Sequence, residues 1–418
     1  MSNTENITQT ANKDLQRISS QTYVIATAFL SLFALVGFGY YGLPFFFDFI
    51  TREYGWSRTV VTSGNALGKL LVGPMFGFIA GWLIDKYGPR RLMMSGILMM
   101  GIALIGLSFA DSLGLFYLFY IFNALGYVFG GPLPCQVLIS SRFDSNRGKA
   151  MGIAYLGIGT GGALAPLIAA AMERNYGWHN SLAALGVIAV ILSFPMVYLL
   201  RGSSSKGSRN IKSETAVPVK NILTDRNFYL LGIGSMCAIG VVGGINQHLK
   251  LYLRDLNFTQ SQAAHVISLV LLSSLAGRVL MGWLADLIHR KYVMILIYMI
   301  VGSSIPLLLI PDFPGRIYIF AVIFGIGLGG DYMIIPLMAG DLFGVRALGR
   351  TMGIILVADG ISESLFPMLL GALYNNVTKS YSIGFIVLIC VALTGAVIIS
   401  FLPKSGESKG MGSLTENG

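Results

Sequence analysis

The chain has 418 residues, of which 54% are hydrophobic and 11% are charged, and its net charge at pH 7 is +10. Soluble globular domains carry about 25% charged residues, so this composition excludes an ordinary soluble protein. Residues 18–47 contain no Asp, Glu, Lys or Arg, and similar stretches recur along the chain. Because about 20 apolar residues suffice for a helix to cross a bilayer, we interpret the chain as a multi-pass helical membrane protein.

Twelve apolar segments of sufficient length predict an all-α membrane protein with twelve transmembrane helices. In chain order they cover residues 23–48, 58–83, 91–110, 113–138, 149–173, 180–200, 227–251, 260–284, 291–310, 317–340, 348–373 and 381–402. They group into an N-terminal six-helix half and a C-terminal six-helix half. The predicted domains are an N-terminal tail at 1–17, the two halves at 18–200 and 227–403, a linker at 201–226, and a disordered tail at 404–418.

The basic residues predict how the chain is oriented. If the N-terminus is cytoplasmic, twenty of the 29 Lys and Arg residues fall in cytoplasmic segments and seven in external ones. Cytoplasmic loops of membrane proteins carry such an excess of basic residues. We therefore expect both termini to be cytoplasmic and the protein to lie in the cell membrane (plasma or bacterial inner). The bias also explains the net charge, so no nucleic-acid partner is expected.

A short sequence occurs twice in the chain. GWLIDKYGPRR at 81–91 matches GWLADLIHRK at 282–291, which pairs Asp85 with Asp286 at an offset of 201 residues. KAMGI at 149–153 and RTMGI at 350–354 keep the same offset. The two halves are therefore tandem repeats, and because six spans are an even number, both halves enter the membrane from the same side.

This arrangement resembles the major facilitator fold, in which the substrate binds between the halves near the middle of the membrane. The loop after the second span resembles the conserved loop signature of that superfamily, and the loop after the eighth span is a degraded copy. The resemblance implies a cytoplasmic gate that latches helix ends of the two halves together. The predicted gate residues are Gly81, Asp85, Arg90, Arg91, Gly282 and Asp286. The alternative is a plain turn that only sets the topology.

Charged side chains inside a membrane span are costly and usually mark a substrate or ion pathway. Arg278 in the eighth span carries a planar guanidinium that matches a carboxylate with two hydrogen bonds, so it is a candidate substrate-binding residue. Its alternative role is a structural ion pair with Asp331, Asp359 or Glu363. These three acids are themselves candidates for proton coupling, although Asp359 and Glu363, one turn apart, could instead form a packing cluster. Lys69 is a further charged residue inside a span.

Polar and aromatic residues near the predicted cavity complete the candidate substrate site. They are Asn246 and His248 in the seventh span, Tyr117, Tyr120 and Asn123 in the fourth, and Tyr332 in the tenth. His248 is also a proton-coupling candidate, because histidine titrates near physiological pH. Tyr117 could equally be an interfacial anchor.

Arg278 and the stretch FDFITREYGWSRT at 47–59 resemble the monocarboxylate transporter family. The resemblance implies proton-coupled symport of a short monocarboxylate such as L-lactate or pyruvate by alternating access. Two features depart from the animal members: Ser274 stands where they place an Asp, and the first span lacks their basic residue. We therefore keep an oxalate/formate-type anion exchanger and a non-transporting membrane receptor as alternatives.

No nucleophile–base or metal-ligand spacing indicates an enzyme, and three Gly-x-Gly-x-x-Gly patterns lie inside apolar spans, where a nucleotide fold has no place. The expected ligands are a small monocarboxylate anion and a proton, and the surroundings are the lipid bilayer. No cofactor, metal or obligatory protein partner is expected.

Overall fold

The computed structural model describes residues 21–56, 58–68, 72–143, 146–200, 219–310, 315–374 and 380–403. Within these ranges the chain is helical and contains no strand. Ten of the helices are long and apolar enough to cross a membrane. The predicted tails at 1–17 and 404–418 lie outside the described residues, as does the linker up to residue 218.

The first half begins with a helix over Gln21–Phe46, which includes the π-helical segment η1 (Phe33–Gly42) and the 3₁₀ turn η2 (Leu43–Phe46). Its other helices are α2 (Phe47–Tyr54), α3 (Arg58–Leu67), α4 (Gly73–Tyr87), α5 (Pro89–Ser108), α6 (Leu113–Gly130), α7 (Pro132–Arg142) and α8 (Arg147–Leu199). Proline occupies the first turn of α5 and α7, where its missing N–H leaves no helical hydrogen bond unmade.

The second half contains α9 (Val219–Thr224), α10 (Arg226–Asp255), α11 (Gln260–Leu287), α12 (Arg290–Ser304), α13 (Pro306–Leu309), α14 (Arg316–Phe343), α15 (Leu348–Leu373) and α16 (Ser382–Ser400). A capping box starts α11: Thr259 accepts from the Gln262 N–H and Gln262 from the Thr259 N–H. The short α9 lies within the segment predicted to be a linker.

The ten long helices account for eleven of the twelve predicted spans. The 53-residue α8 holds the fifth and sixth spans, because Gly177 takes a left-handed backbone (φ 73°, ψ 163°) that turns the chain between them. The second predicted span is divided between α3 and α4. The predicted fold class, an all-α membrane protein of two six-helix halves, is therefore confirmed.

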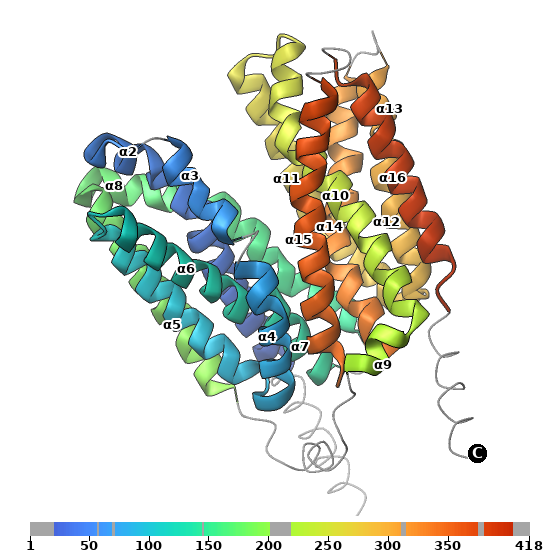
Figure 1. Cartoon of the computed structure of the whole chain (residues 1–418), viewed down its shortest axis with the longest axis horizontal. Helices are drawn as coiled ribbons and strands as arrows, with labels where there is room; N and C mark the ends of the chain where they lie inside the picture. The colour runs from blue at the N-terminus through green and yellow to red at the C-terminus, as the bar shows by residue number, and fades with distance from the viewer. Residues whose placement is uncertain are drawn as a thin grey trace, which may run out of the picture.

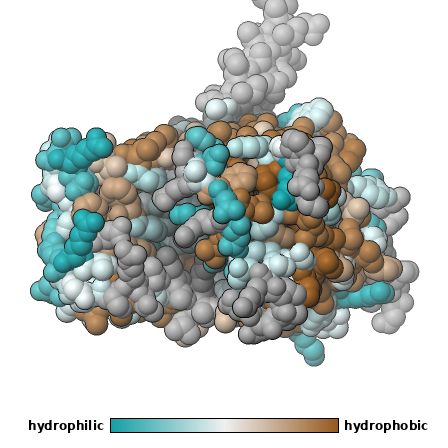
Figure 2. Space-filling view, turned by 90° about the horizontal axis from the view of Figure 1, so that it is seen from above, coloured by the Kyte–Doolittle hydropathy of each residue, from teal (hydrophilic) through white to brown (hydrophobic). Residues whose placement is uncertain are grey.

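The two halves stand side by side and meet at one end (Figure 1). The joined end, which we call the Asp85 end, is formed mainly by α4 against α15 and by α8 against α11. Toward the opposite end the halves diverge (Figure 1). Seen from that opposite end, hydrophilic residues lie on both halves (Figure 2).

The repeat found in the sequence is also a repeat of helix contacts. Gly126 on α6 lies against the backbone of α5 at Met100, and Gly327 on α14 lies against α12 at Val301. Gly327 follows Gly126 by 201 residues, and Val301 follows Met100 by the same number. The same packing is therefore built in both halves from different side chains.

Candidate functional site

A cavity of about 320 Å³ lies between the two halves. The first half contributes polar and aromatic side chains to its wall, namely Tyr40, Tyr41, Tyr120, Asn123, Tyr127, Gln136 and Tyr155. The second half contributes most of the charged ones, and its polar wall residues are Asn246, Ser274, Arg278, Tyr332, Asp359 and Glu363. Six tyrosines surround the space, so a ligand would meet ring faces and hydroxyl groups together.

Arg278 reaches this cavity from α11 and is partly buried. Its Nη1 donates a hydrogen bond of 2.5 Å to the backbone carbonyl of Tyr155 on α8, in the other half. Among the described residues, no carboxylate lies within 4.0 Å of its guanidinium, so it forms no ion pair with Asp331, Asp359 or Glu363. A positive charge at membrane depth is thus left available to an anion in the cavity.

Four further predicted binding residues line the same cavity as Arg278: Asn246, Tyr120, Asn123 and Tyr332. Asn123 donates from Nδ2 to the Gly39 carbonyl at 3.1 Å, whereas its Oδ1 has no hydrogen-bond partner in the part of the chain that is described. The structure therefore brings together residues from α6, α10, α11 and α14. Their role in binding stays a prediction.

Two predicted binding residues lie elsewhere. The ring nitrogens of His248 contact the Tyr381 hydroxyl at 3.1 Å and the Pro367 carbonyl at 3.0 Å, which holds the ring between α10, α15 and α16. The hydroxyl of Tyr117 is 2.8 Å from that of Ser63. Neither residue is part of the cavity wall.

The acidic candidates divide into two groups. Asp359 and Glu363, one turn apart on α15, both line the cavity. Asp331 on α14 is fully buried, with no exposed surface, and is not part of the cavity wall. Lys69 lies outside the described residues.

Sequence reasoning missed several wall residues, including Tyr40, Tyr41 and Tyr127. A signal for Tyr127 was present, because it follows Tyr120 by seven residues, which is two helical turns on one face. Tyr40 and Tyr41 belong to η1, which contains one of the Gly-x-Gly-x-x-Gly patterns that the sequence analysis set aside. The π-helical winding of η1 has no sequence signature, and such segments are frequent at functional sites.

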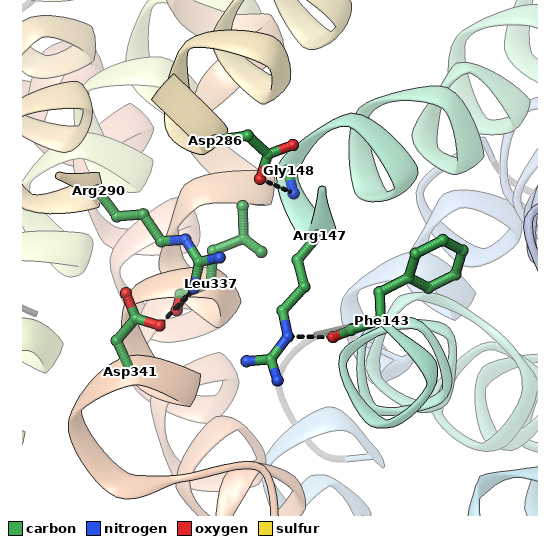
Figure 3. A network of polar contacts seen from close by, with 7 residues as sticks. All are labelled: Phe143, Arg147, Gly148, Asp286, Arg290, Leu337 and Asp341. Atoms are coloured by element: carbon green, nitrogen blue, oxygen red, sulfur yellow. Dashed lines mark hydrogen bonds and ion pairs between the residues drawn. The ribbon is translucent and has the colours of Figure 1, made fainter. Parts of the chain in front are cut away.

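At the Asp85 end, two aspartates hold the halves together through repeat-related contacts. The Oδ2 of Asp85 on α4 forms an ion pair of 3.1 Å with the Nε of Arg350 on α15. Asp286 on α11 accepts from the backbone N–H groups of Gly148 and Lys149, both at 2.8 Å, at the start of α8. Figure 3 shows this second contact beside the ion pair of Arg290 with Asp341, which stays within the second half. A carboxylate is stabilised at the start of a helix by its free N–H groups and dipole.

The predicted gate glycines allow the helix backbones to touch at this end. A Cβ at Gly81 would lie 2.3 Å from the carbonyl oxygen of Gly349, and one at Gly282 would lie 2.5 Å from that of Gly148. Real Cβ atoms do not come so close to backbone, so only glycine fits there. The α4–α15 and α8–α11 crossings therefore depend on glycine in both repeats.

The remaining predicted gate residues do not cross between halves. Arg90 donates to the backbone carbonyls of Val197 and Tyr198 at the end of α8, within the first half. Arg91 is exposed. Arg350, which the sequence motif does not contain, supplies the basic partner from the other half.

We expect Gly81→Ala to push the halves apart at the Asp85 end. Overpacking costs about 1–3 kcal/mol, which is enough to change the ratio of two conformations about tenfold. The distance between spin labels on the ends of α4 and α15 should increase. Gly232→Ala on α10 is the control, because a Cβ there meets no atom within 4 Å. An unchanged distance in Gly81→Ala would contradict the close approach.

The ion pair between Asp85 and Arg350 predicts a coupled effect. Asp85→Asn and Arg350→Gln should each raise the population with separated α4 and α15 ends about tenfold, because losing one partner of a buried pair is strongly destabilising. The double variant should change the population with separated ends by less than the effects of the two single variants combined. The same label distances report the result, with the exposed Asp111→Asn as a control. Strictly additive shifts would rule out a direct pair.

The sequence model of the Major Facilitator Superfamily matches residues 29–264 and 231–414. Among characterised relatives, monocarboxylate transporter 13 of Rattus norvegicus is 25% identical over 340 residues, covering 77% of this chain and 75% of that protein. The agnestins efflux protein of Paecilomyces divaricatus is 26% identical over 350 residues (80% and 76%). The cis,cis-muconate transport protein of Acinetobacter baylyi is 24% identical over 405 residues (90% and 94%).

Two solved structures share the fold. A proton:xylose symporter aligns with a TM-score of 0.69 at 14% identity, covering 93% of this chain and 97% of that one. The fucose:proton symporter of E. coli aligns with a TM-score of 0.70 at 12% identity, covering 91% and 98%. At these identities the likeness concerns the arrangement of helices alone.

Proposed function

Since this chain belongs to the Major Facilitator Superfamily and is a multi-pass membrane transporter, we propose that it carries a short monocarboxylate, such as L-lactate or pyruvate, together with a proton. The resemblance to monocarboxylate transporter 13 supports this choice of substrate class. The transport is secondary active and proceeds by alternating access, in which the cavity opens to one side of the membrane at a time.

One observation carries the proposal: Arg278 faces the cavity without an acidic partner among the described residues. Desolvating a carboxylate is expensive unless a counter-charge and hydrogen bonds replace its water. A guanidinium offers both in a flat, two-point geometry. The Tyr and Asn side chains of the opposite wall supply donors and acceptors for a hydroxyl or keto group on the same substrate.

The acids in the same cavity favour a single negative charge on the substrate. Asp359 and Glu363 line the wall contributed by the second half, as Arg278 does. A second carboxylate on the substrate would face the carboxylate oxygens of Asp359 and Glu363. The described wall has no cation besides Arg278 to balance its charge. This charge distribution favours a monocarboxylate over the dianion that an oxalate exchanger would take.

The excess of basic residues in one set of loops assigns the Asp85 end to the cytoplasm. With that assignment, the conformation closed at the Asp85 end receives substrate from outside. Release into the cell then requires the Asp85 and Asp286 contacts to break. The glycine crossings of α4 with α15 and of α8 with α11 must separate at the same time.

Replacement of Arg278 tests the substrate assignment. Arg278→Lys keeps the charge but loses the planar fork, so L-lactate uptake by proteoliposomes should fall at least about tenfold. Arg278→Gln should abolish binding and uptake. Because Arg278 forms no ion pair here, both variants should keep a melting temperature in detergent close to that of the parent.

Arg174→Gln, which removes an exposed arginine, serves as the matched control for loss of charge. Wild-type lactate affinity in a stable Arg278→Gln protein would refute the carboxylate-binding role. Binding of lactate without accumulation in vesicles would identify a receptor. Uptake driven by internal anion and insensitive to a pH gradient would identify an exchanger.

A further inference from the structure

Two carboxyl groups inside the second half lack the partners that buried acids normally have. Asp331 on α14 has no exposed surface, and neither of its carboxylate oxygens has a hydrogen-bond partner among the residues that the structure describes. Asp359 on α15 is 3% exposed; its Oδ1 accepts from the Ser235 hydroxyl at 2.7 Å, and its Oδ2 has no partner. Within the described chain neither acid forms an ion pair.

Among the described residues, the titratable groups that interact with these acids are acidic or neutral and carry no positive charge. Asp331 and Asp359 interact electrostatically with one another, and the Tyr298 phenol on α12 interacts with both. The Tyr298 hydroxyl is fully buried and also lacks a hydrogen-bond partner. Further titratable neighbours are Cys237 on α10, which interacts with Tyr298, Glu363 on α15, which interacts with Asp359, and Tyr332 on α14, which interacts with Asp331. All of them are neutral or acidic.

The repeat shows that the fold does not need these polar groups. At the offset of 201 residues, the first half carries Ile97, Gly130 and Ile158 in place of Tyr298, Asp331 and Asp359. The α5–α6 and α12–α14 pairs, which carry Ile97 with Gly130 and Tyr298 with Asp331, pack in the same register, as the contacts of Gly126 and Gly327 show. Two acids and a phenol thus replace apolar positions at a substantial desolvation cost, which a structural role does not explain.

One of the two acids has access to the cavity. Asp359 lines the same cavity as Arg278, and its repeat partner Ile158 lines the cavity from the first half. Asp331 is not part of the wall and is fully buried, and it interacts electrostatically with Asp359. A proton that binds to Asp359 can therefore exchange with water in the cavity and interact with Asp331 from there.

We propose that Asp331 and Asp359 together form the proton-binding site of this transporter, with Asp359 as the group that exchanges the proton with the cavity. The inference rests on the proposed symport. One proton leaves cavity water and bonds to a carboxylate oxygen of Asp359, and it returns to water by the same route after the cavity has opened to the other side. The substrate anion on Arg278 and the proton on the pair then cross the membrane together.

The test compares two transport modes in proteoliposomes. The proteins are the parent, Asp359→Asn, Asp331→Asn and the exposed control Asp111→Asn. One assay measures accumulation of labelled L-lactate driven by an inward proton gradient, together with the internal pH change. The other measures exchange of labelled for unlabelled lactate at equal pH, which requires no net proton movement.

We expect Asp359→Asn to lose gradient-driven accumulation and the lactate-dependent pH change while retaining exchange. Asp331→Asn should reduce the gradient-driven component in the same way, and Asp111→Asn should behave as the parent. Asparagine matches the size of aspartate, and retained exchange itself shows that the variant is folded. If Asp359→Asn fails to fold, the comparison of gradient-driven accumulation with exchange in Asp331→Asn alone tests the proton-binding site.

Coupling that survives intact in both Asp331→Asn and Asp359→Asn would overturn the inference while leaving the symport proposal standing. Loss of coupling in Glu363→Gln, with both aspartate variants still coupled, would overturn it in the same way. Accumulation driven by a sodium gradient at equal pH, and lost in the aspartate variants, would replace the proton with sodium. If the parent itself shows neither gradient-driven accumulation nor a pH change, the symport proposal fails first.

Discussion

The cost of a charge inside a membrane governs the interior of this protein. Each buried ionised group must find a partner, bind a proton or face water. Arg278 makes one hydrogen bond, to a backbone carbonyl of the opposite half, and otherwise faces the cavity. Asp331 and Asp359 have no cationic partner among the described residues. These unbalanced charges sit in the second half, whereas the described cavity wall of the first half is aromatic and polar. Among the described wall residues, the charged side chains thus come from the second half, and the first half contributes aromatic and uncharged polar ones.

Access to these charges is controlled where the halves meet. Among the described residues, an ion pair and two backbone hydrogen bonds join the halves there, and each is provided by an aspartate of the repeated motif. Glycines at the same crossings let backbones approach without side chains between them. A junction built from such directional polar contacts and glycine crossings is compatible with two discrete arrangements, one with these contacts formed and one with them broken. Alternating access requires such a two-state element.

The sequence predicted the spans and the repeat well because both follow from hydrophobicity and from local identity. The gate was predicted only in part: Asp85 is in the motif, but its partner Arg350 is 265 residues away and no local pattern joins them. Asn246 and His248 were expected to share the cavity. Residues two apart on a helix are turned by about 200°, so one face cannot present both. Asn246 takes the cavity side and His248 packs against α15 and α16. The absence of a described ion pair at Arg278 could not be inferred without the positions of all the acids.

In the proposed mechanism, the carboxylate of the substrate takes the place of the acidic partner that Arg278 lacks among the described residues. An experimental structure of the protein with bound L-lactate tests this most directly. The account predicts the lactate carboxylate within hydrogen-bond distance of two guanidinium nitrogens of Arg278, with the hydroxyl directed at the tyrosine and asparagine side chains of the opposite wall. A lactate bound elsewhere, with Arg278 paired to Asp359 or Glu363, would contradict it.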